Sequence, residues 1–453
     1  MSSYAGVVLA AGKGTRMKSK IPKVLHQICG REMVRLVVDS LAEAGLHPIV
    51  VVVPPDSDAI RSALGDGVVY VEQREPLGSG HALLQARAAL DTGTSLFVIN
   101  GDVPLLRPES ILALTRAHHE REACITLLTS LVAGKEGKGR VLRSHDGDIV
   151  GIVEESEADA ATLSVPEINT GAYCFATSWL WDNLSDLPPS RNGEVFLTDL
   201  VAEAGEQGLS VGAVVTEDAG EAVSVNTRVQ LAVAEGVLRQ RIREKWMLSG
   251  VSMPDPGAVY IDLDAELGED TVLHPNTHVR GASRIGSDCE VGPNSMVIDS
   301  VIGNGCKVVA SSIEGSRLQD RVAVGPYSRV RGGSRLMDDV YLGNFTDIKN
   351  SVLGRGTKSS HFSYIGDAVI GSNVNIGAGT VTCNYDGVRK NQTTIGDDAF
   401  IGSDSMLVAP LNIGARASTG AGSVVTKDVP PDSLAVGVPA RLVRKKAGRK
   451  EQA

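Results

Sequence analysis

Aliphatic residues recur at every sixth position through much of the second half of the chain. The repeat is clearest at Val324, Val330, Leu336, Leu342 and Ile348, and it returns at Ile370, Ile376, Ile395, Ile401, Leu407 and Ile413. A six-residue period matches neither a lone helix nor a lone strand. It predicts a parallel β-helix in which each hexapeptide supplies one short strand and one turn. The repeated residue then points inward and stacks on its counterpart one coil later.

Glycine often follows the repeated residue, as at Gly286, Gly292, Gly303, Gly366 and Gly402. We expect these glycines to allow tight corners, because glycine tolerates positive φ. The repeat is interrupted at residues 359–364 and again at residues 382–391. Loops that project from a rigid solenoid are natural places for a site, so both interruptions are candidates.

Composition narrows the class of protein. The chain has 453 residues, enough for two or three domains, and a net charge of −10, which argues against a general nucleic-acid surface. Its six cysteines lack metal-ligand spacing, which argues against a zinc site or a disulfide framework and favours a reducing compartment. The sequence shows no signal peptide and no apolar run of the ~20 residues that a membrane span needs. We expect a cytoplasmic protein with small-molecule partners, bound to neither membrane nor nucleic acid.

The first half reads as an α/β domain. Apolar runs predict buried parallel strands, and periodic segments between them predict helices. The predicted strands are Val7–Leu9, Ile49–Val53 and Leu96–Ile99, and the helices Met33–Ala44, His81–Leu90 and Glu109–Glu120. This alternation predicts a doubly wound, Rossmann-like sheet that binds ligands at the carboxyl ends of its strands. We expect this domain over residues 1–227, a helical linker over 228–248, and the hexapeptide domain over 249–453. The basic tail from Arg441 is either a solvated end or part of a pocket rim.

A phosphate-binding loop follows the first predicted strand. The segment LAAGKGTRM, residues 9–17, contains small residues that let backbone N–H groups approach phosphate oxygens. Arg16 and Lys23 add positive charge that could neutralise a triphosphate. The alternative is an ordinary tight turn between a strand and a helix.

Two further segments favour a ligand site over that alternative. Gln73 precedes a second glycine-rich turn at residues 77–81, which opens a predicted helix. Asp102 follows the predicted strand Leu96–Ile99, where a carboxylate is well placed to hold a hard cation such as Mg²⁺. An isolated Asp would more often be a turn or cap residue, but this one lies at the ligand-binding edge of the sheet.

These motifs resemble those of the sugar-1-phosphate nucleotidyltransferases. The matching segments are LAAGKGTRM, Pro22-Lys23, residues 78–81, 101–104, 151–155 and 168–171, and Val225-Asn226. With the hexapeptide half, the chain resembles the bacterial bifunctional family that joins an N-acetylglucosamine-1-phosphate uridylyltransferase to a glucosamine-1-phosphate N-acetyltransferase. That family implies a left-handed parallel β-helix, a homotrimer and a role in supplying cell-envelope precursors. The handedness follows from the resemblance alone, since it opposes the usual crossover preference.

The resemblance assigns roles in the first half. The uridine nucleotide of UTP would contact Leu9, Ala10, Ala11, Gly12, Gln73, Gly78 and Ser79. Gly139, Glu154 and Asn169 would hold the GlcNAc moiety, Asp102 and Asn226 would coordinate Mg²⁺, and Lys23 and Arg16 would stabilise charge on the phosphates. Attack of a sugar phosphate on the α-phosphorus needs such cations and no covalent protein nucleophile. Lys138 stands where the family often has Tyr.

His361 is the strongest candidate for a catalytic residue in the second half. An average histidine is a surface or packed residue, but this one has Tyr364, Asn375, Asn384 and Tyr385 in nearby coils. A neutral imidazole is suited to take a proton from an attacking amine. By the resemblance, His361 is the general base, and glucosamine-1-phosphate is held by Arg331, Lys349, Tyr364 and Asn375. Acetyl-CoA would contact Ala378, Asn384, Tyr385, Ser403 and Ala421.

This half also departs from the family. Gly332 replaces the usual Pro, Phe362-Ser363 replaces Leu-Thr, and a late Arg before Val438-Pro439 has no clear match. Two hypotheses remain open. The chain is either a two-site enzyme, or a nucleotidyltransferase whose solenoid serves only for oligomerisation or regulation. Acetyl-CoA consumption with glucosamine-1-phosphate separates them. A pure binding module would leave the phosphate loop and the Asp102/Asn226 pair unexplained.

Overall fold

A computed structural model of the chain describes residues 4–90, 95–131, 138–155, 157–190 and 193–443. These residues belong to two compact units, Met1–Leu238 and Arg239–Ala453. The division falls inside helix α7 (Arg228–Leu248), the segment expected to form the linker. Within the described ranges, no helix has the length and apolar character needed to cross a bilayer. Most of the basic tail lies outside the described residues.

The first unit is built on a nine-stranded sheet whose main order is β11-β7-β10-β6-β1-β4-β5, with β8 paired to β10 and β9. Its strands are β1 (Tyr4–Leu9), β4 (Ile49–Val53), β5 (Val69–Glu72), β6 (Ser95–Asn100), β7 (Ile125–Leu131), β8 (Arg140–Arg143), β9 (Ile149–Val153), β10 (Glu167–Phe175) and β11 (Val211–Val215). Its helices are α1 (Met33–Glu43), α2 (Asp58–Leu64), α3 (Ser79–Ala86), α4 (Pro108–Arg121), α5 (Thr177–Leu184) and α6 (Asp199–Glu206).

The three predicted strands of this sheet are confirmed, since β1 pairs in parallel with both β4 and β6. One feature differs from the expected parallel sheet. Strand β10 runs antiparallel to both β6 and β7. It is buried along its whole length, so its apolar side chains contribute to the core on both faces. The α/β fold is confirmed, but the sheet is mixed.

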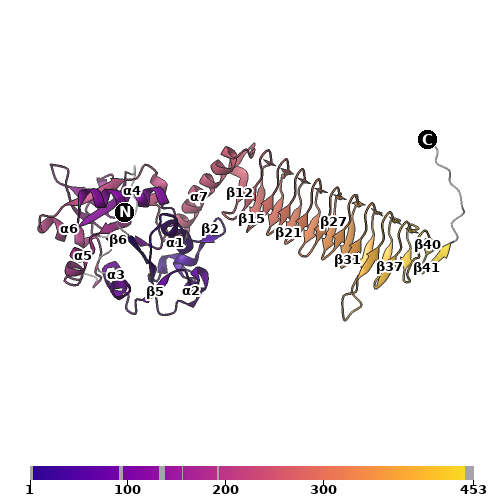
Figure 1. The fold of residues 1–453 in the computed structure, drawn as a ribbon, viewed down its shortest axis with the longest axis horizontal. Helices are drawn as coiled ribbons and strands as arrows, with labels where there is room; N and C mark the ends of the chain where they lie inside the picture. Colours follow the sequence, from indigo (N-terminus) through magenta and orange to yellow (C-terminus); the bar gives the residue numbers. More distant parts are fainter. Residues whose placement is uncertain (1–3, 91–94, 132–137, 156, 191–192, 444–453) are drawn as a thin grey trace. The chain divides into compact units, whose positions relative to one another are not determined.

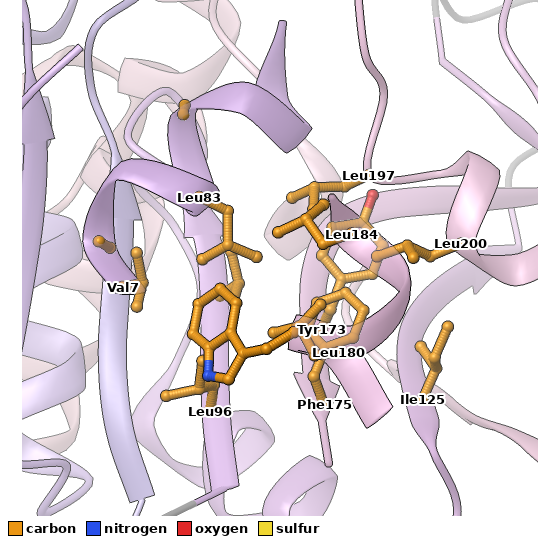
Figure 2. Packing of buried hydrophobic residues seen from close by; sticks show 14 of the residues in the cluster. Val7, Leu83, Leu96, Ile125, Tyr173, Phe175, Leu180, Leu184, Leu197 and Leu200 are labelled. Atoms are coloured by element: carbon orange, nitrogen blue, oxygen red, sulfur yellow. The ribbon is translucent and has the colours of Figure 1, made fainter. Parts of the chain in front are cut away.

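Two hydrophobic cores cover the two faces of this sheet. Successive side chains of β1 point to opposite faces of the sheet, so Val7 belongs to one core and Val8 to the other. Figure 2 shows the first core, to which α3 contributes Leu83, α5 contributes Leu180 and β10 contributes Phe175. Because helices pack against both faces, the polar strand ends remain at the edge of the sheet, where a ligand can reach them.

The second unit is a solenoid of three parallel sheets. Its successive coils, from β12 (Val259–Ile261) to β39 (Val424–Val425), stack along one axis in Figure 1. The sheets run β12-β15-β18-β21-β24-β27-β30-β33-β36-β39, β13-β16-β19-β22-β25-β28-β31-β34-β37 and β14-β17-β20-β23-β26-β29-β32-β35-β38-β40-β41. We name these the first, second and third faces. Strand β41 (Ala440–Val443) folds back antiparallel on β40 (Leu434–Gly437) and ends the stack.

The inward repeat is confirmed residue by residue. Every repeated aliphatic residue named from the sequence is at most 3% exposed. The stacking is also confirmed, since Val324 pairs with Leu342 and Val330 pairs with Ile348 one coil later. A column of aliphatic side chains therefore runs through the solenoid and supplies its core, which accounts for stability with few aromatic residues.

The expected role of the corner glycines is only partly right. Gly292 has a positive φ of 104°, as expected, but Gly286, Gly303, Gly366 and Gly402 do not. A Cβ on Gly402 would lie 2.6 Å from the carbonyl oxygen of Thr419 in the next coil. Most of these glycines are thus needed because adjacent coils approach closely. Many left-handed corner positions are instead taken by Asp and Asn, which tolerate that conformation.

The two interruptions of the repeat have different structures. Residues 359–364 form no projecting loop: Ser359 ends β29 (Lys358–Ser359) and takes the inward position at 0% exposure. The expectation of a loop there is wrong, because a buried Ser can replace an aliphatic residue in the column. Residues 384–392 do form a loop, between β33 (Val381–Cys383) and β34 (Thr393–Ile395), and Figure 1 shows it leaving the solenoid between β31 (Ala368–Ile370) and β37 (Leu411–Ile413).

Candidate active sites

The first site lies at the carboxyl ends of β1 and β6. These strands end side by side, because Leu9 and Asn100 are paired in register. The following loops are anchored: the Ala10 N–H donates to the Val52 carbonyl over 2.8 Å, and the Gly101 N–H donates to the Leu9 carbonyl over 2.9 Å. A cavity opens at this edge. Its lining includes Leu9, Ala10, Ala11, Gly12, Arg16, Lys23, Gln73, Gly78, Ser79 and Asp102.

The glycine-rich loop brings a lysine over this cavity. Gly14 has a φ of 58°, and a Cβ there would lie 2.5 Å from the Cβ of Lys23. The loop therefore needs glycine at this position both for its conformation and for its contact with Lys23. Arg16 is exposed at the rim of the same cavity. With Lys13, three cationic residues line a cavity whose other residues are mostly small and neutral, which suits a polyphosphate.

The second glycine-rich turn is closed by an extended segment near residue 195. Val195 donates its N–H to the Leu77 carbonyl over 2.9 Å, and its own carbonyl accepts from the Gly80 N–H over 2.8 Å. A Cβ on Gly78 would lie 2.4 Å from the Val195 carbonyl oxygen, so only glycine fits. This contact fixes the wall of the cavity on which Gly78 and Ser79 lie.

A second cavity adjoins the first. Both are lined by Ser79, Asn100 and Asp102, and the second adds Gly139, Glu154, Asn169 and Asn226. The structure thus places the residues expected to hold the sugar next to those expected to hold the nucleotide. Asn169 donates its side-chain amide to the Tyr173 hydroxyl over 2.6 Å, and its N–H to the Gly139 carbonyl over 2.9 Å.

Glu154 lies in this second cavity with a perturbed pKa. Burial raises the pKa of its carboxyl, while a hydrogen bond from the Thr198 hydroxyl, 3.2 Å long, acts in the opposite direction. A half-buried carboxylate that has no cationic partner among the described residues favours ligands that donate hydrogen bonds, such as sugar hydroxyls. Lys138, which replaces the usual Tyr, also lines the cavity.

Asp102 and Asn226 come together at the boundary of the two cavities. The Val225 N–H donates to the Asp102 carbonyl over 2.9 Å, which joins the two loops. The Lys23 ammonium donates to the Asp102 carboxylate and, over 3.0 Å, to Asn226 Oδ1. Both oxygens therefore already face a cation, and they are the hard oxygen ligands that Mg²⁺ prefers, alongside water and phosphate. The donor set fits Mg²⁺.

Glu221 supports this cluster and was not found from the sequence. It is 1% exposed, and its carboxylate accepts from the Arg107 N–H over 2.9 Å and from the Ser110 hydroxyl over 2.7 Å. The Thr216 hydroxyl also donates to it. Glu221 thus joins the chain that follows Asp102 to the chain that leads to Asn226. No motif signals this role, since Arg107 and Ser110 are more than a hundred positions from Glu221 in the sequence.

Replacing Glu221 by Gln is expected to lower kcat/KM for nucleotidyl transfer about tenfold. Residues that hold metal ligands in place typically change metal affinity or activity by about tenfold or more when they are substituted. The amide cannot accept from all the donors that the carboxylate satisfies. Initial rates over a Mg²⁺ titration measure the effect. Glu217→Gln is the matched control, because Glu217 is exposed in the same segment. An unchanged Mg²⁺ dependence in E221Q would contradict this role.

The second site follows one edge of the solenoid, between its third and first faces. His361 lies at this edge, between β29 and β30 (Ser363–Gly366), and it is exposed. Hydrogen bonds continue along the edge through later coils: the Gly379 N–H donates to the Phe362 carbonyl over 2.7 Å, the Asp404 N–H to Ala378 over 2.6 Å, and the Gly422 N–H to Ser403 over 2.8 Å. Ala378, Ser403 and Ala421 therefore lie at equivalent corners of successive coils beyond His361. Their small side chains leave a track for an extended arm.

The residues expected to hold the sugar phosphate lie on both sides of this edge. Arg331 of β24 (Arg329–Arg331) is in register with Lys349 of β27 (Thr346–Lys349) on the first face. Tyr364 is in the next coil of that face, and Asn375 of β32 (Asn375–Ile376) lies on the third face. The guanidinium of Arg331 is held by two hydrogen bonds to Asp347, 2.9 and 2.8 Å long.

The projecting loop supplies polar groups to this region. Asn384 donates its side-chain amide to Asp367 over 2.5 Å and lies 3.4 Å from the Tyr364 hydroxyl. Tyr385 is 62% exposed, and its hydroxyl donates to the Gly387 carbonyl over 2.7 Å. Asn384 is thus fixed beside Tyr364, whereas Tyr385 presents its ring to solvent.

Lys390, also from this loop, is a cation that the sequence analysis did not assign. The positive charge of Lys390, with a smaller contribution from Arg331, lowers the pKa of Lys349. Like charges brought together in this way favour an anion between them. The sequence feature that could have pointed to Lys390 is the insertion in the repeat, because the inserted loop brings Lys390 back toward the face that bears Lys349.

Replacing Lys390 by Ala is expected to raise KM for the sugar phosphate several-fold with little change in kcat, because an exposed cation contributes only modestly to binding a phosphate. Steady-state rates at varied sugar phosphate measure this. Arg389→Ala is the matched control: Arg389 lies in the same loop, and its side chain pairs with Asp386 at 3.7 Å. Equal effects of the two substitutions would contradict a specific role for Lys390.

Comparisons with known proteins agree with this division. Residues 6–204 match the MobA-like NTP transferase domain family. Residues 264–299 match the bacterial transferase hexapeptide family, 282–357 the GlmU-like C-terminal hexapeptide family, and 392–427 the hexapeptide repeat of succinyl-transferase.

Similar curated proteins cover nearly the whole chain. Bifunctional protein GlmU of Heliobacterium modesticaldum is 44% identical over 438 residues, 96% of each chain. That of Pelobacter propionicus is 44% identical over 443 residues, again 96% of each chain. That of Fervidobacterium nodosum is 44% identical over 450 residues, 98% of this chain and 97% of its own. With such identity over both units, the chain belongs to the family of bifunctional GlmU proteins.

Proposed function

We propose that this chain makes UDP-N-acetylglucosamine, a cell-envelope precursor, in two steps at two sites. The hexapeptide domain, residues 249–453, acetylates glucosamine-1-phosphate from acetyl-CoA. The N-terminal domain, residues 1–227, then transfers UMP from UTP to N-acetylglucosamine-1-phosphate and releases pyrophosphate. The observation that carries this proposal is that bifunctional relatives align with the whole chain while each unit holds its own polar site.

In the acetyl step, the sugar amine attacks the thioester carbonyl carbon of acetyl-CoA. A C–N bond forms, the C–S bond breaks, and coenzyme A leaves as the thiol. His361 takes the proton that the amine loses, a task that its exposed position at the edge permits. Arg331 and Lys349 bind the sugar phosphate, and Lys390 adds a third positive charge. Tyr364 and Asn375 orient the sugar, while Asn384, Tyr385, Ala378, Ser403 and Ala421 contact acetyl-CoA.

In the uridylyl step, a phosphate oxygen of N-acetylglucosamine-1-phosphate attacks the α-phosphorus of UTP. A P–O bond forms there, and the bond to the pyrophosphate oxygen breaks. Leu9 to Gly12 approach the nucleotide through their backbone, and Gln73, Gly78 and Ser79 contact its base and ribose. Gly139, Glu154 and Asn169 hold the sugar. Lys23 and Arg16 reduce repulsion between the two anionic substrates.

Asp102 and Asn226 would hold Mg²⁺ in this step. The ion would neutralise developing charge on the phosphates. Because Lys23 already donates to both side chains, metal binding would release its ammonium toward the phosphates. The position of Lys23 therefore supports a role in which its ammonium and the metal ion together neutralise phosphate charge beside Asp102 and Asn226.

The assembly and compartment are also proposals. We propose a homotrimer, since hexapeptide β-helices commonly assemble in this way and since the second site lies open on the edge of a single chain. Exposed aromatic residues on that edge, Tyr327 at 64% and Phe345 at 59%, stack on each other and would be covered by a second copy. We place the enzyme in the cytoplasm, where its six cysteines, none of which forms a disulfide in the described structure, would stay reduced.

The test is the complete conversion on purified protein. Glucosamine-1-phosphate, acetyl-CoA, UTP and Mg²⁺ should yield UDP-N-acetylglucosamine, coenzyme A and pyrophosphate, separated by chromatography. Addition of EDTA should stop the sequence at N-acetylglucosamine-1-phosphate. Failure to form the nucleotide sugar from supplied N-acetylglucosamine-1-phosphate and UTP would refute the function of the first site.

A further inference from the structure

Gln73 presents one defined face of its side-chain amide to the nucleotide cavity. It follows β5 directly, is 6% exposed, and its N–H is bound to the Val53 carbonyl over 2.9 Å. Its side-chain nitrogen lies 3.1 Å from the Gly78 carbonyl oxygen and 3.1 Å from His81 Nδ1. A carbonyl oxygen can only accept, so the amide atom that faces Gly78 must be the nitrogen.

Both hydrogens of this NH₂ group are thereby assigned. One goes to Gly78, and the other points at His81 Nδ1, which must accept it. The remaining atom, Oε1, has no hydrogen-bond partner among the residues that the structure describes, and Gln73 lines the cavity. The cavity therefore offers an acceptor at this point of its wall.

The tautomer of His81 follows from the same contact. If Nδ1 accepts, the neutral ring carries its hydrogen on Nε2. Gln85 lies one turn later on α3, and in the structure its amide nitrogen lies 3.2 Å from both this Nε2 and the His81 carbonyl oxygen. A hydrogen on Nε2 therefore requires the half-buried Gln85 amide to give up its bond to that carbonyl and turn its oxygen toward the ring. With Gln85 turned in this way, Gln85, His81 and Gln73 form a short chain of hydrogen bonds that leads to the cavity.

We propose that His81 is a positioning residue that determines base specificity through Gln73. Uracil carries a hydrogen on ring atom N3, whereas cytosine has a lone pair there and an amino group beside it. A fixed acceptor in the cavity favours the first base and opposes the second. This inference rests on the proposed uridylyl function and names the group that sets its choice of pyrimidine.

Without His81, one amide hydrogen of Gln73 loses its acceptor inside a buried environment. When the amide then turns over and offers NH₂ to the cavity, a face that suits cytosine, it loses its Gly78 bond and brings its oxygen against the Gly78 carbonyl, but it no longer gives up a bond to His81. Discrimination should therefore weaken without disappearing. We expect the ratio of kcat/KM for UTP to that for CTP to fall about tenfold, mainly through a higher KM for UTP.

The experiment compares this ratio in the wild-type chain, H81L and H81N. Leucine removes the acceptor, whereas the Oδ1 of asparagine can take the place of His Nδ1. The ratio should fall in H81L and be largely retained in H81N. Acetyl transfer, measured on the same preparations, is assigned to the second unit and should not change. A wild-type ratio in H81L, or an equal fall in both variants, would overturn the proposal.

A second pair of variants leaves His81 in place. Gln85→Glu accepts from Nε2–H and keeps Nδ1 as the acceptor, whereas Gln85→Lys donates to Nε2 and moves the ring hydrogen to Nδ1. The ratio should be retained in Q85E and fall in Q85K. Equal ratios in these two chains would overturn the proposal even if H81L did not fold. If the wild-type chain is inactive with UTP, the proposed uridylyl function itself is refuted. This outcome differs from a wild-type ratio in H81L, which would refute only the role of His81.

Discussion

Replacing His361 by Ala is expected to reduce acetyl transfer to glucosamine-1-phosphate by about 10²- to 10⁴-fold, the usual contribution of a general base. The imidazole is exposed at the edge of the solenoid, so its loss opens no cavity in the core. Substrate binding should change little, because the phosphate is held by Arg331 and Lys349. The fall should therefore appear in kcat, measured as release of coenzyme A thiol.

The same variant should retain uridylyl transfer at the wild-type rate. His274→Ala is the matched control, since His274 lies in the solenoid, where its ring is 3.1 Å from Glu290 and outside the proposed site. H274A should retain both steps. The assignment of His361 would be contradicted if H361A kept its acetyl transfer, or if it lost uridylyl transfer while acetylation remained.

Replacing Asp102 by Asn should have the largest effect on the other step. Uridylyl transfer is expected to fall by about 10²-fold or more, because a neutral amide is a poor replacement for the one carboxylate proposed to face the metal. The lost charge also removes the ion pair with Lys23. Rates at saturating N-acetylglucosamine-1-phosphate, over a range of Mg²⁺ and UTP concentrations, measure the loss.

Acetyl transfer in D102N should equal that of the wild type, because that step is assigned to the second unit. Asp56→Asn provides the control, since Asp56 is an exposed carboxylate of the same unit. The metal-site proposal fails if D102N keeps its uridylyl rate and its Mg²⁺ dependence. Direct binding of Mn²⁺ to the nucleotide-free chain gives a second readout, in which D102N should bind more weakly than D56N.

The solenoid could be predicted from sequence because one local rule repeats. Residues such as Val330 and Ile348 occupy equivalent places in successive coils, so a period alone determines which side chains point inward. The period does not show which physical constraint, backbone conformation or close packing between coils, requires a given residue type. Gly402 was expected to need a positive φ, but it is instead limited by the carbonyl of Thr419 in the next coil. Contacts between coils are not visible in the period of one coil.

The first site was predictable where its residues follow a strand. The loops after β1 and β6 meet at the sheet edge, as parallel strands require. The meeting of Asp102 with Asn226 came from family resemblance, because no local pattern joins residues so far apart. Glu221 had no signal at all: a single buried acid becomes recognisable only when its donors from other segments are seen.

The second site shows the same limit. Residues 359–364 were read as a loop because the aliphatic repeat fails there, yet Ser359 fills the inward position and the coil continues. The insertion at 384–392 was recognised, but the contribution of Lys390 depends on the path by which the loop returns to Lys349. Irregular loops have no period, so their side chains cannot be placed from sequence.

The central claim is that the solenoid is a second enzyme with its own active site. The most direct measurement is release of coenzyme A thiol by the purified chain from acetyl-CoA and glucosamine-1-phosphate, with EDTA present to stop nucleotidyl transfer. We predict steady release that requires the amino sugar and is lost in H361A. No release by the wild-type chain, when the same preparation converts UTP after Mg²⁺ is restored, would show that the solenoid only supports the first unit.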